Sequence, residues 1–178
     1  FASADGTAQT VTITIAGAND AATIAGDTTG AATEDVSTAA TGALTATDTD
    51  TGESSMADKV STASTYGTYS MTSGTWTYSL DSTNSAVQAL ASGSSLSDSL
   101  SFASADGTAQ TVTITIAGAD DASVWAGTST GSVTEDDSAT TATGALTITD
   151  TDDGETPTIS DVSSTAGANG YGNFVMAS

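Results

Sequence analysis

The chain contains neither cysteine nor histidine. Without cysteine, no disulfide and no thiolate metal site can hold the fold together. Without histidine as well, zinc sites, haem ligation and the Ser-His and Cys-His catalytic pairs are excluded. Any metal site in this protein must therefore be built from hard oxygen ligands.

Basic residues are nearly absent too. One lysine or arginine faces 22 aspartates and glutamates, and the formal net charge is −21. Such a chain is not expected to bind nucleic acid, whose phosphates need basic partners. A compact fold with so few cations cannot neutralise its own carboxylates, so its folded state must overcome self-repulsion. Bound cations would remove this repulsion.

Long apolar runs are missing as well. No stretch is long enough to span a bilayer, and the opening residues lack the charged and apolar segments of a signal sequence. We therefore expect an internal segment of a longer exported protein, whose export signal lies elsewhere in that protein.

What the chain does contain is a repeat. The sequence FASADGTAQTVTITIAGA occurs at Phe1 to Ala18 and again at Phe102 to Ala119. A period of about a hundred residues is too long for a solenoid unit and suits self-contained β domains joined head to tail. We expect the C-terminal strands of one repeat at 1–21, a complete repeat at 22–122 and the N-terminal part of a third at 123–178.

Strict alternation marks the strands. Thr111 to Ile116 alternates threonine with an apolar residue, which is typical of a half-buried strand. Asp106-Gly107 before it is a hairpin turn signal and predicts an antiparallel partner at Leu100 to Phe102.

A second alternating segment, Thr75 to Leu80, places Trp76, Tyr78 and Leu80 on one face, where they are expected to form the core. Further strands are predicted at Gly42 to Thr47 and Tyr66 to Met71, with one short helix at Ala86 to Leu90. Short strands with turn signals every eight to twelve residues or so, and almost no helix, predict an all-β fold of β-sandwich repeats.

The acidic residues gather at strand ends and between repeats. Three groups recur: Asp48 and Asp50 with Asp150 and Asp152; Glu34 and Asp35 with Glu135 and Asp136; and Asn19 and Asp20 with Asp120 and Asp121. Asp81 at the end of the Trp76 strand is a further single acid. Calcium takes roughly six to eight oxygen ligands, which such groups can supply. The alternative is a solvated acidic surface, but scattered solubilising charge would not need to gather at domain junctions.

Several motifs occur in the order found in one known family. They are Val133 to Asp136, Ala142 to Asp152, Tyr66 to Tyr69, Gly74 to Asp81, Ala86 to Leu90 and Gly118 to Asp121. Together they resemble the VCBS repeat of giant bacterial RTX-type adhesins, and the resemblance extends over the whole chain. It implies cadherin-like or Ig-like domains in long tandem arrays, exported by type I secretion and stiffened by calcium at the surface of Gram-negative bacteria.

A wider resemblance to cadherins implies two sets of interdomain calcium ligands. The junction after the complete repeat would use Glu34, Asp81, Asp120, Asp121, Asp150 and Asp152. The earlier junction would use Asn19, Asp20, Asp48 and Asp50. One departure concerns Asp81, because Ser82 and Thr83 follow it and the second acid of the cadherin turn is missing.

These observations favour a non-catalytic spacer that projects a distal binding domain for cell adhesion and biofilm formation. Paired carboxylates also perform glycoside hydrolysis, but acids that recur in every copy are better explained as structural ligands. The alternative function is a carbohydrate-binding, lectin-like adhesin module, which glycan-array binding would support.

Four further expectations concern partners and single residues. Each repeat should contact its identical neighbours in the chain, and as a hypothesis the tail of one molecule docks onto the head of the next by strand addition. Trp125 is expected to pack at a junction between repeats. Asp152→Ala should weaken a junction more than Asp98→Ala, because Asp98 lies outside the acidic groups.

Overall fold

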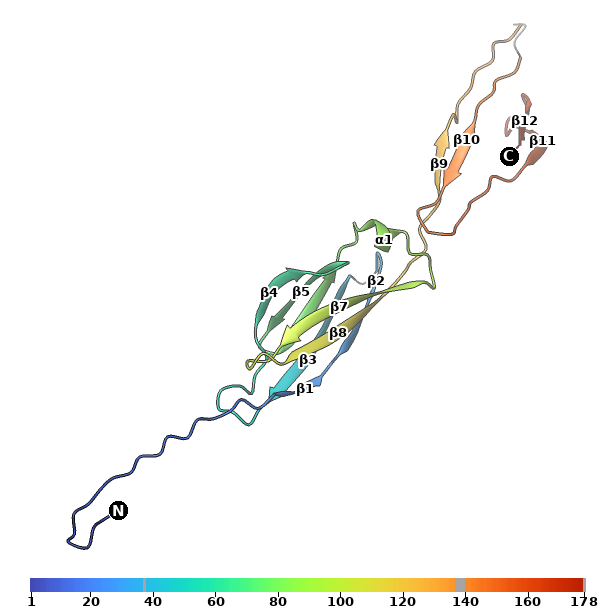
Figure 1. Cartoon of the computed structure of the whole chain (residues 1–178). Helices are drawn as coiled ribbons and strands as arrows, with labels where there is room; N and C mark the ends of the chain where they lie inside the picture. The colour runs from blue at the N-terminus through green and yellow to red at the C-terminus, as the bar shows by residue number, and fades with distance from the viewer. Residues whose placement is uncertain (37, 137–139, 178) are drawn as a thin grey trace.

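The computed structural model describes residues 1–36, 38–136 and 140–177. We call residues 22–122 the central unit, residues 1–21 the N-terminal tail and residues 123–178 the C-terminal part. The tail and the C-terminal part extend from opposite ends of the central unit, so the molecule is elongated (Figure 1). The division of the chain into repeats stays a prediction.

The central unit consists of strands and one short helix. Its strands are β1 (Thr23–Gly26), β2 (Thr29–Thr33), β3 (Ala39–Thr47), β4 (Lys59–Ala63), β5 (Gly67–Thr72), β6 (Thr75–Leu80), β7 (Ser95–Ala103) and β8 (Ala109–Ala117). The helix α1 (Ser85–Gln88) precedes β7. In the C-terminal part, β9 (Val124–Gly127) pairs with β10 (Leu146–Thr149), and β11 (Val162–Ala166) pairs with β12 (Asn173–Met176).

Two sheets form a sandwich in the central unit, which confirms the predicted all-β fold. One has the strand order β1-β3-β6-β5-β4 and the other β2-β8-β7. The neighbouring strands are antiparallel except β2 and β8, which are parallel. Because β1 and β2 follow one another in the chain but join different sheets, the first residues of the unit tie both layers together.

The core lies between the sheets and comes from the alternating segments. In β8, Val112, Ile114 and Ile116 are completely buried, and β7 pairs with this strand as predicted. Trp76 and Tyr78 of β6 reach the core from the other sheet. Burying each of these side chains contributes about 1.5 to 3 kcal/mol, which fixes the register of both strands.

Two glycines make room for the tryptophan. Gly42 of β3 lies directly opposite Trp76, and a Cβ atom there would come within 2.4 Å of the indole ring. A Cβ atom on Gly30 of β2 would lie 2.8 Å from the same ring. The indole N–H donates to the carbonyl oxygen of Asp27 at 2.9 Å, so the one polar atom of this side chain is satisfied.

The helix forms where the sequence predicted it. Asn84 caps its first turn, with its side chain accepting from the backbone N–H of Ala86 at 3.0 Å. Val87 is buried in the core, which holds the turn against the sandwich. The helix thereby places Gln88 and Ala89 at the end of the central unit that faces the C-terminal part. In the described part of the chain, no helix is long and apolar enough to cross a membrane.

Candidate functional site

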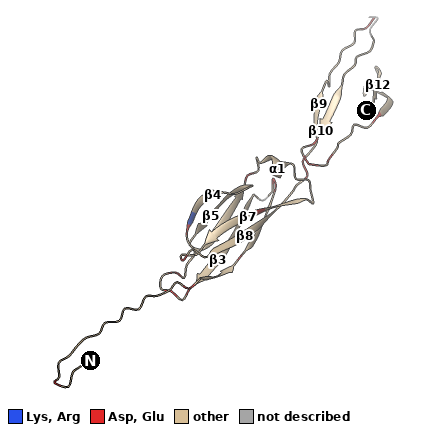
Figure 2. Cartoon of the chain, viewed as in Figure 1, with Lys and Arg blue, Asp and Glu red and all other residues tan. Residues whose placement is uncertain are grey.

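Acidic residues converge at both ends of the central unit. Asp48, Asp50 and Glu53 form the entry cluster, where the chain enters the unit; Asp120, Asp152 and Glu155 form the exit cluster. In each cluster, one carboxylate oxygen from every residue lies within 4.8 Å of the others. Figure 2 shows the acidic residues in the loops at these ends, while the one lysine lies on β4.

The local sequence after β3 folds the entry acids toward one point. The Asp48 carboxylate accepts from the backbone N–H of Asp50 at 2.7 Å, and the Ser54 hydroxyl donates to the Asp48 carbonyl oxygen at 3.1 Å. Asp150 accepts from the backbone N–H of Asp152 at 3.1 Å in the same way. Such side-chain turns are a local property of Asp, so the repeated Asp-Thr-Asp sequence produces the same geometry twice.

The second aspartate of each Asp-Thr-Asp sequence also accepts a hydrogen bond from the linker, the segment that precedes β1 or β9. The backbone N–H of Asp20 donates to Asp50 at 2.8 Å, and that of Asp121 donates to Asp152 at 2.8 Å. At the entry end, Asp106 in the β7–β8 turn accepts from the backbone N–H of Ala22 at 3.0 Å. Hydrogen bonds from Ser104 and Thr108 hold the pKa of Asp106 far below its usual range.

Glu34 connects the exit cluster to the central unit. It follows β2, is 1% exposed, and accepts from the side-chain amide of Gln88 at 2.9 Å. Burial raises the pKa of Glu34, and the charges of Asp121, Asp35 and Asp152 raise it further. These groups therefore lie near enough to repel one another when all are ionised.

The exit cluster bridges the central unit and the C-terminal part. The backbone N–H of Asp153 donates to the carbonyl oxygen of Ala89 at 2.9 Å, which joins the two directly. Burial raises the pKa of Asp121, with the Asp152 charge next in effect. Burial likewise raises the pKa of Glu155, with the charge of Asp120 next.

Each cluster contains at least one buried carboxylate oxygen that accepts no hydrogen bond from a described residue. Asp152 is 3% exposed, and within the described ranges its Oδ1 has no donor, while Oδ2 accepts from the linker. Asp48 Oδ2 and Glu53 Oε2 at the entry end are in the same state. Leaving a buried polar atom unpaired costs free energy. The lone lysine cannot relieve this cost, because the Lys59 amine lies 5.2 Å from the centre of the Tyr69 ring.

The donor set suits a hard divalent cation. Both clusters offer carboxylate oxygens, some of them already oriented by backbone hydrogen bonds, which are the ligands that calcium prefers. Burial raises the pKa of Glu53, followed by the charges of Asp48 and Asp50. A cation among these groups would favour their ionised forms.

The structure brings most of the predicted residues together. Glu34, Asp35, Asp120, Asp121, Asp150 and Asp152 gather at the exit end, and Asp20, Asp48 and Asp50 gather at the entry end.

Four predicted residues lie outside these two groups. The Asp81 carboxylate accepts from the backbone N–H and hydroxyl of Thr83, which lower its pKa. The Asn19 amide is exposed and donates to the Asp20 carbonyl oxygen at 3.1 Å. Glu135 and Asp136 are exposed in the C-terminal part.

Sequence reasoning missed two acids of the clusters and the role of a third acid beside the entry cluster. Glu53 and Glu155 complete an Asp-x-Asp-x-Gly-Glu motif that is present in both copies, so the repeat itself carried the signal. Asp106 was considered only as a turn residue, yet it anchors the linker at Ala22.

The comparison of Asp152→Ala with Asp98→Ala stays a prediction, but Asp98 is a poor control for it. Asp98 lies outside the clusters, but it is 1% exposed in the core and accepts from the Tyr66 N–H at 3.0 Å and the Tyr78 hydroxyl at 3.1 Å. Removing it would therefore disturb the sandwich itself. Trp125 also differs from expectation, since it lies opposite Ile148 in the β9–β10 pair and is 54% exposed.

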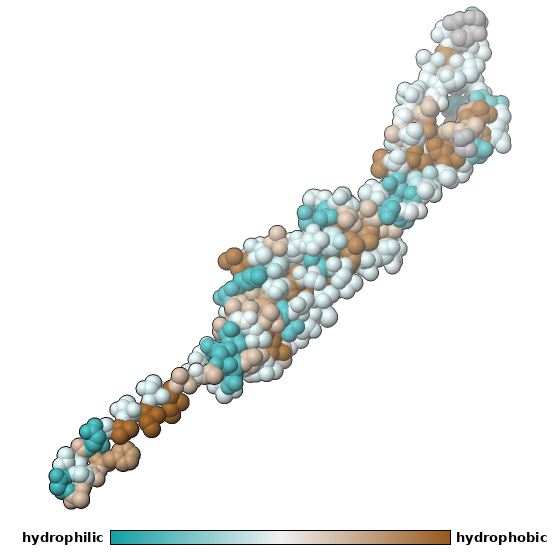
Figure 3. All heavy atoms as spheres, in the orientation of Figure 1, coloured by the Kyte–Doolittle hydropathy of each residue, from teal (hydrophilic) through white to brown (hydrophobic). Residues whose placement is uncertain are grey.

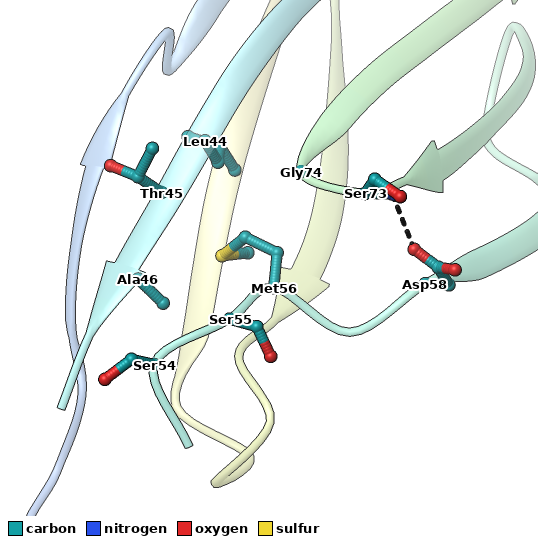
Figure 4. A pocket seen from close by; sticks show the side chains of 9 residues that line it. All are labelled: Leu44, Thr45, Ala46, Ser54, Ser55, Met56, Asp58, Ser73 and Gly74. Atoms are coloured by element: carbon teal, nitrogen blue, oxygen red, sulfur yellow. Dashed lines mark hydrogen bonds between the residues drawn. The ribbon is translucent and has the colours of Figure 1, made fainter. Parts of the chain in front are cut away.

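A pocket beside β3 does not coincide with either cluster. Leu44 and Met56 line it together with the Ser73-Gly74 turn (Figure 4). Its carboxylate, Asp58, accepts from the backbone N–H of Ser73 at 2.7 Å, as the dashed line in Figure 4 marks. That carboxylate is engaged in holding the turn, so the acidic clusters remain the better candidate site.

Comparison with known proteins agrees with this architecture. Residues 19–118 match the family model of the bacterial cadherin-like domain, and no curated protein matches the chain. Cadherin-like domains are generally non-enzymatic and commonly bind calcium, and the bacterial ones are typically extracellular. Because the match covers more than half of the chain and the central unit is a β-sandwich, the chain belongs to the bacterial cadherin-like domain family.

Proposed function

We propose that this chain is a calcium-stiffened extender segment of a large bacterial surface adhesin of the VCBS and RTX type. It acts mechanically rather than catalytically. Calcium at the entry and exit clusters neutralises their carboxylates and restrains bending between neighbouring repeats. The array thereby projects a distal binding domain from the cell for adhesion and biofilm formation, after export by type I secretion.

The observation that carries this proposal is the state of Asp152. One of its oxygens is committed to the linker, and the other is buried without a donor among carboxylates of like charge. A side chain in that state destabilises the junction unless a cation is bound. The same arrangement of unpaired oxygens at Asp48 and Glu53 supports a second site at the entry end.

The origin of the ligands explains why calcium would stiffen the array. Glu34 belongs to the central unit, whereas Asp152 and Glu155 belong to the part that follows. An ion held by both groups ties two repeats together and adds to the hydrogen bond between Asp153 and Ala89. In the absence of the ion, the same carboxylates repel one another and favour a bent or separated junction.

Calcium titration of the full chain by calorimetry, combined with thermal unfolding in calcium and in chelator, tests the proposal. We expect saturating calcium to raise the melting temperature by at least about 5 °C. Asp152→Asn preserves the shape of the side chain and should weaken binding at the exit cluster by at least about tenfold.

Asp5→Asn is the matched control, because it removes the same charge from the exposed turn of the N-terminal tail. This variant should bind calcium like the unaltered chain. Identical melting curves in calcium and in chelator would overturn the proposal.

A further inference from the structure

The chain enters the central unit at one end and leaves it at the other. The linker before β1 comes from the tail, and β8 continues into the linker before β9 (Figure 1). Figure 3 shows the same elongated outline in the space-filling view. Because β1, β3 and β8 run along this long axis, tension on the chain pulls β1 and β8 along their own lengths in opposite directions.

Two residues carry the chain from one sheet to the other. β1 pairs with β3 in the five-stranded sheet, whereas β2 pairs with β8 in the three-stranded sheet. Asp27 and Thr28 connect β1 to β2, and we call them the crossover. A force that acts on β1 reaches β2 only through the crossover, so the contacts of these two residues determine how that force is distributed between the sheets.

Hydrogen bonds fasten the crossover to both sheets. The Asp27 backbone N–H donates to the Ala43 carbonyl oxygen at 2.7 Å, and the Asp27 carboxylate accepts from the Ala43 N–H at 2.9 Å. The Asp27 carbonyl oxygen accepts from the Trp76 indole N–H at 2.9 Å. The Thr28 carbonyl oxygen accepts from the backbone N–H of Thr113 in β8 at 3.0 Å. The crossover is therefore attached to β3, β6 and β8 at once.

Gly26 brings Asp27 close to β3. Its φ is +123°, a conformation that residues with a side chain rarely adopt. A Cβ atom at this position would lie 2.2 Å from the Ala43 carbonyl oxygen, so only glycine allows this close approach. The Asp27 carboxylate can then reach the N–H of the same Ala43 whose carbonyl oxygen accepts from the Asp27 backbone.

We propose that the crossover is a mechanical clamp in which the Asp27 carboxylate is the force-bearing side chain. Under tension, Asp27 transfers load from β1 to β3 and β6, and it must detach before β2 can slide along β8. β2 pairs with β8 along its whole length, and these pairs are loaded lengthwise, so they resist together rather than one after another. The inference rests on the proposed mechanical function for its biological role, but it requires no bound calcium.

The second copy of the motif differs at this position. Ala25 to Asp27 corresponds to Ala126 to Thr128, so threonine replaces the aspartate. The Thr128 N–H still donates to the carbonyl oxygen of Ala145, the counterpart of Ala43, at 2.7 Å. Threonine has no carboxylate to complete the pair of bonds that Asp27 makes. Asp27→Thr therefore reproduces a naturally occurring form of the crossover, which we expect to be weaker.

Single-molecule force spectroscopy of the full chain, held by its two ends in chelator, tests the clamp. Unfolding of the central unit is recognised by a gain in contour length on the order of 30 nm. We expect Asp27→Ala to raise the unfolding rate at constant force at least about tenfold, because forced unfolding depends on the interactions that break at the barrier. Asp27→Thr should behave like Asp27→Ala. Asp27→Asn keeps a side-chain acceptor and should remain close to the unaltered chain.

Asp58→Ala is the matched control. Asp58 also accepts from one backbone N–H through an exposed carboxylate, that of Ser73 at 2.7 Å, but it lies beside the β5–β6 turn rather than between β1 and β2. In urea, without tension, Asp27→Ala and Asp58→Ala should lower the free energy of unfolding by similar amounts. Under tension, Asp58→Ala should change the unfolding rate by less than about twofold. Equal effects of the two variants under tension, or no effect of Asp27→Ala, would overturn the proposal.

The same measurement separates the clamp from calcium binding. Asp27 belongs to neither acidic cluster, so the difference between Asp27→Ala and Asp58→Ala should be the same in calcium and in chelator. A difference that vanished in chelator would contradict the clamp. If melting does not respond to calcium, the calcium proposal fails while this difference remains, so the two proposals can fail separately.

Discussion

At the scale of single residues, Asp98 is the carboxylate on which the sandwich itself depends. Burial alone would raise its pKa, but hydrogen bonds from the backbone N–H groups of Tyr66 and Thr65 and from the Tyr78 hydroxyl lower it below the usual value. The side chain therefore remains ionised in the core and satisfies donors from two separate segments. Its role is to hold the β4–β5 turn against β7 rather than to bind an ion.

Asp98→Ala should destabilise the central unit because it leaves the Tyr66 N–H and the Tyr78 hydroxyl without their acceptor. We expect a loss of about 2 to 4 kcal/mol in the free energy of unfolding, measured by urea denaturation. Asp98→Asn keeps part of the acceptor capacity and should cost less. Ser99→Ala, at an exposed neighbouring position of β7, is the control. A loss below about 0.5 kcal/mol for Asp98→Ala would refute this role.

The buried position of Asp98 could be predicted from the sequence, but its hydrogen-bond donors could not. Leu96, Asp98 and Leu100 alternate with serine, so the period of two already places Asp98 on the inner face of β7. It could not reveal which donors would meet the carboxylate, because Tyr66 and Tyr78 approach from another sheet. Glu53 and Glu155 were missed for a different reason, since their role depends on a loop that returns toward the preceding acids.

At the scale of elements, strand formation depends on partners as much as on composition. The strict alternation of β6 and β8 was sufficient to predict both strands and the side chains that they bury. β1, β2 and β4 were not predicted, because they are short and consist mostly of Ala, Gly, Ser and Thr. Residues 10–18 show the same dependence. They have the sequence of residues 111–119, which form most of β8, but they form no strand, because no described strand lies beside them.

The contact between β3 and β6 offers a test of packing at this scale. Gly42→Ala places a methyl group against the buried Trp76 indole, which cannot move without disturbing the core. We expect it to destabilise the central unit by about 1 to 3 kcal/mol in chemical denaturation. Gly144→Ala changes the equivalent glycine of the same Ala-Thr-Gly-Ala-Leu-Thr motif, which has Thr128 rather than a tryptophan beside it. Equal losses of stability for both variants would show that contact with the Trp76 ring is not the cause of the loss.

At the scale of the whole molecule, acidic side chains are concentrated where the central unit meets the tail and the C-terminal part. The Asp-Thr-Asp pairs and linker acids were predicted from their recurrence, and the structure brings them together at the two ends of the central unit. Sequence alone could not show that Gln88 and Ala89 of the α1 region form hydrogen bonds at the exit end, because these contacts depend on how the helix packs. The exit end is thus assembled from elements far apart in the sequence.

This concentration of acids predicts opposite pH responses with and without calcium. Burial and neighbouring charges raise the folded-state pKa of Glu34, Asp121 and Glu155, so the folded state binds more protons than the unfolded chain as these groups titrate. In chelator, lowering the pH from about 7 to about 5 should therefore raise the melting temperature. In saturating calcium the same change should lower it, because protons displace the bound ion. Glu34→Gln, which removes one titrating group but keeps an acceptor for Gln88, should flatten the slope in chelator. Melting temperatures that change in the same direction under both conditions would contradict a cation-binding junction.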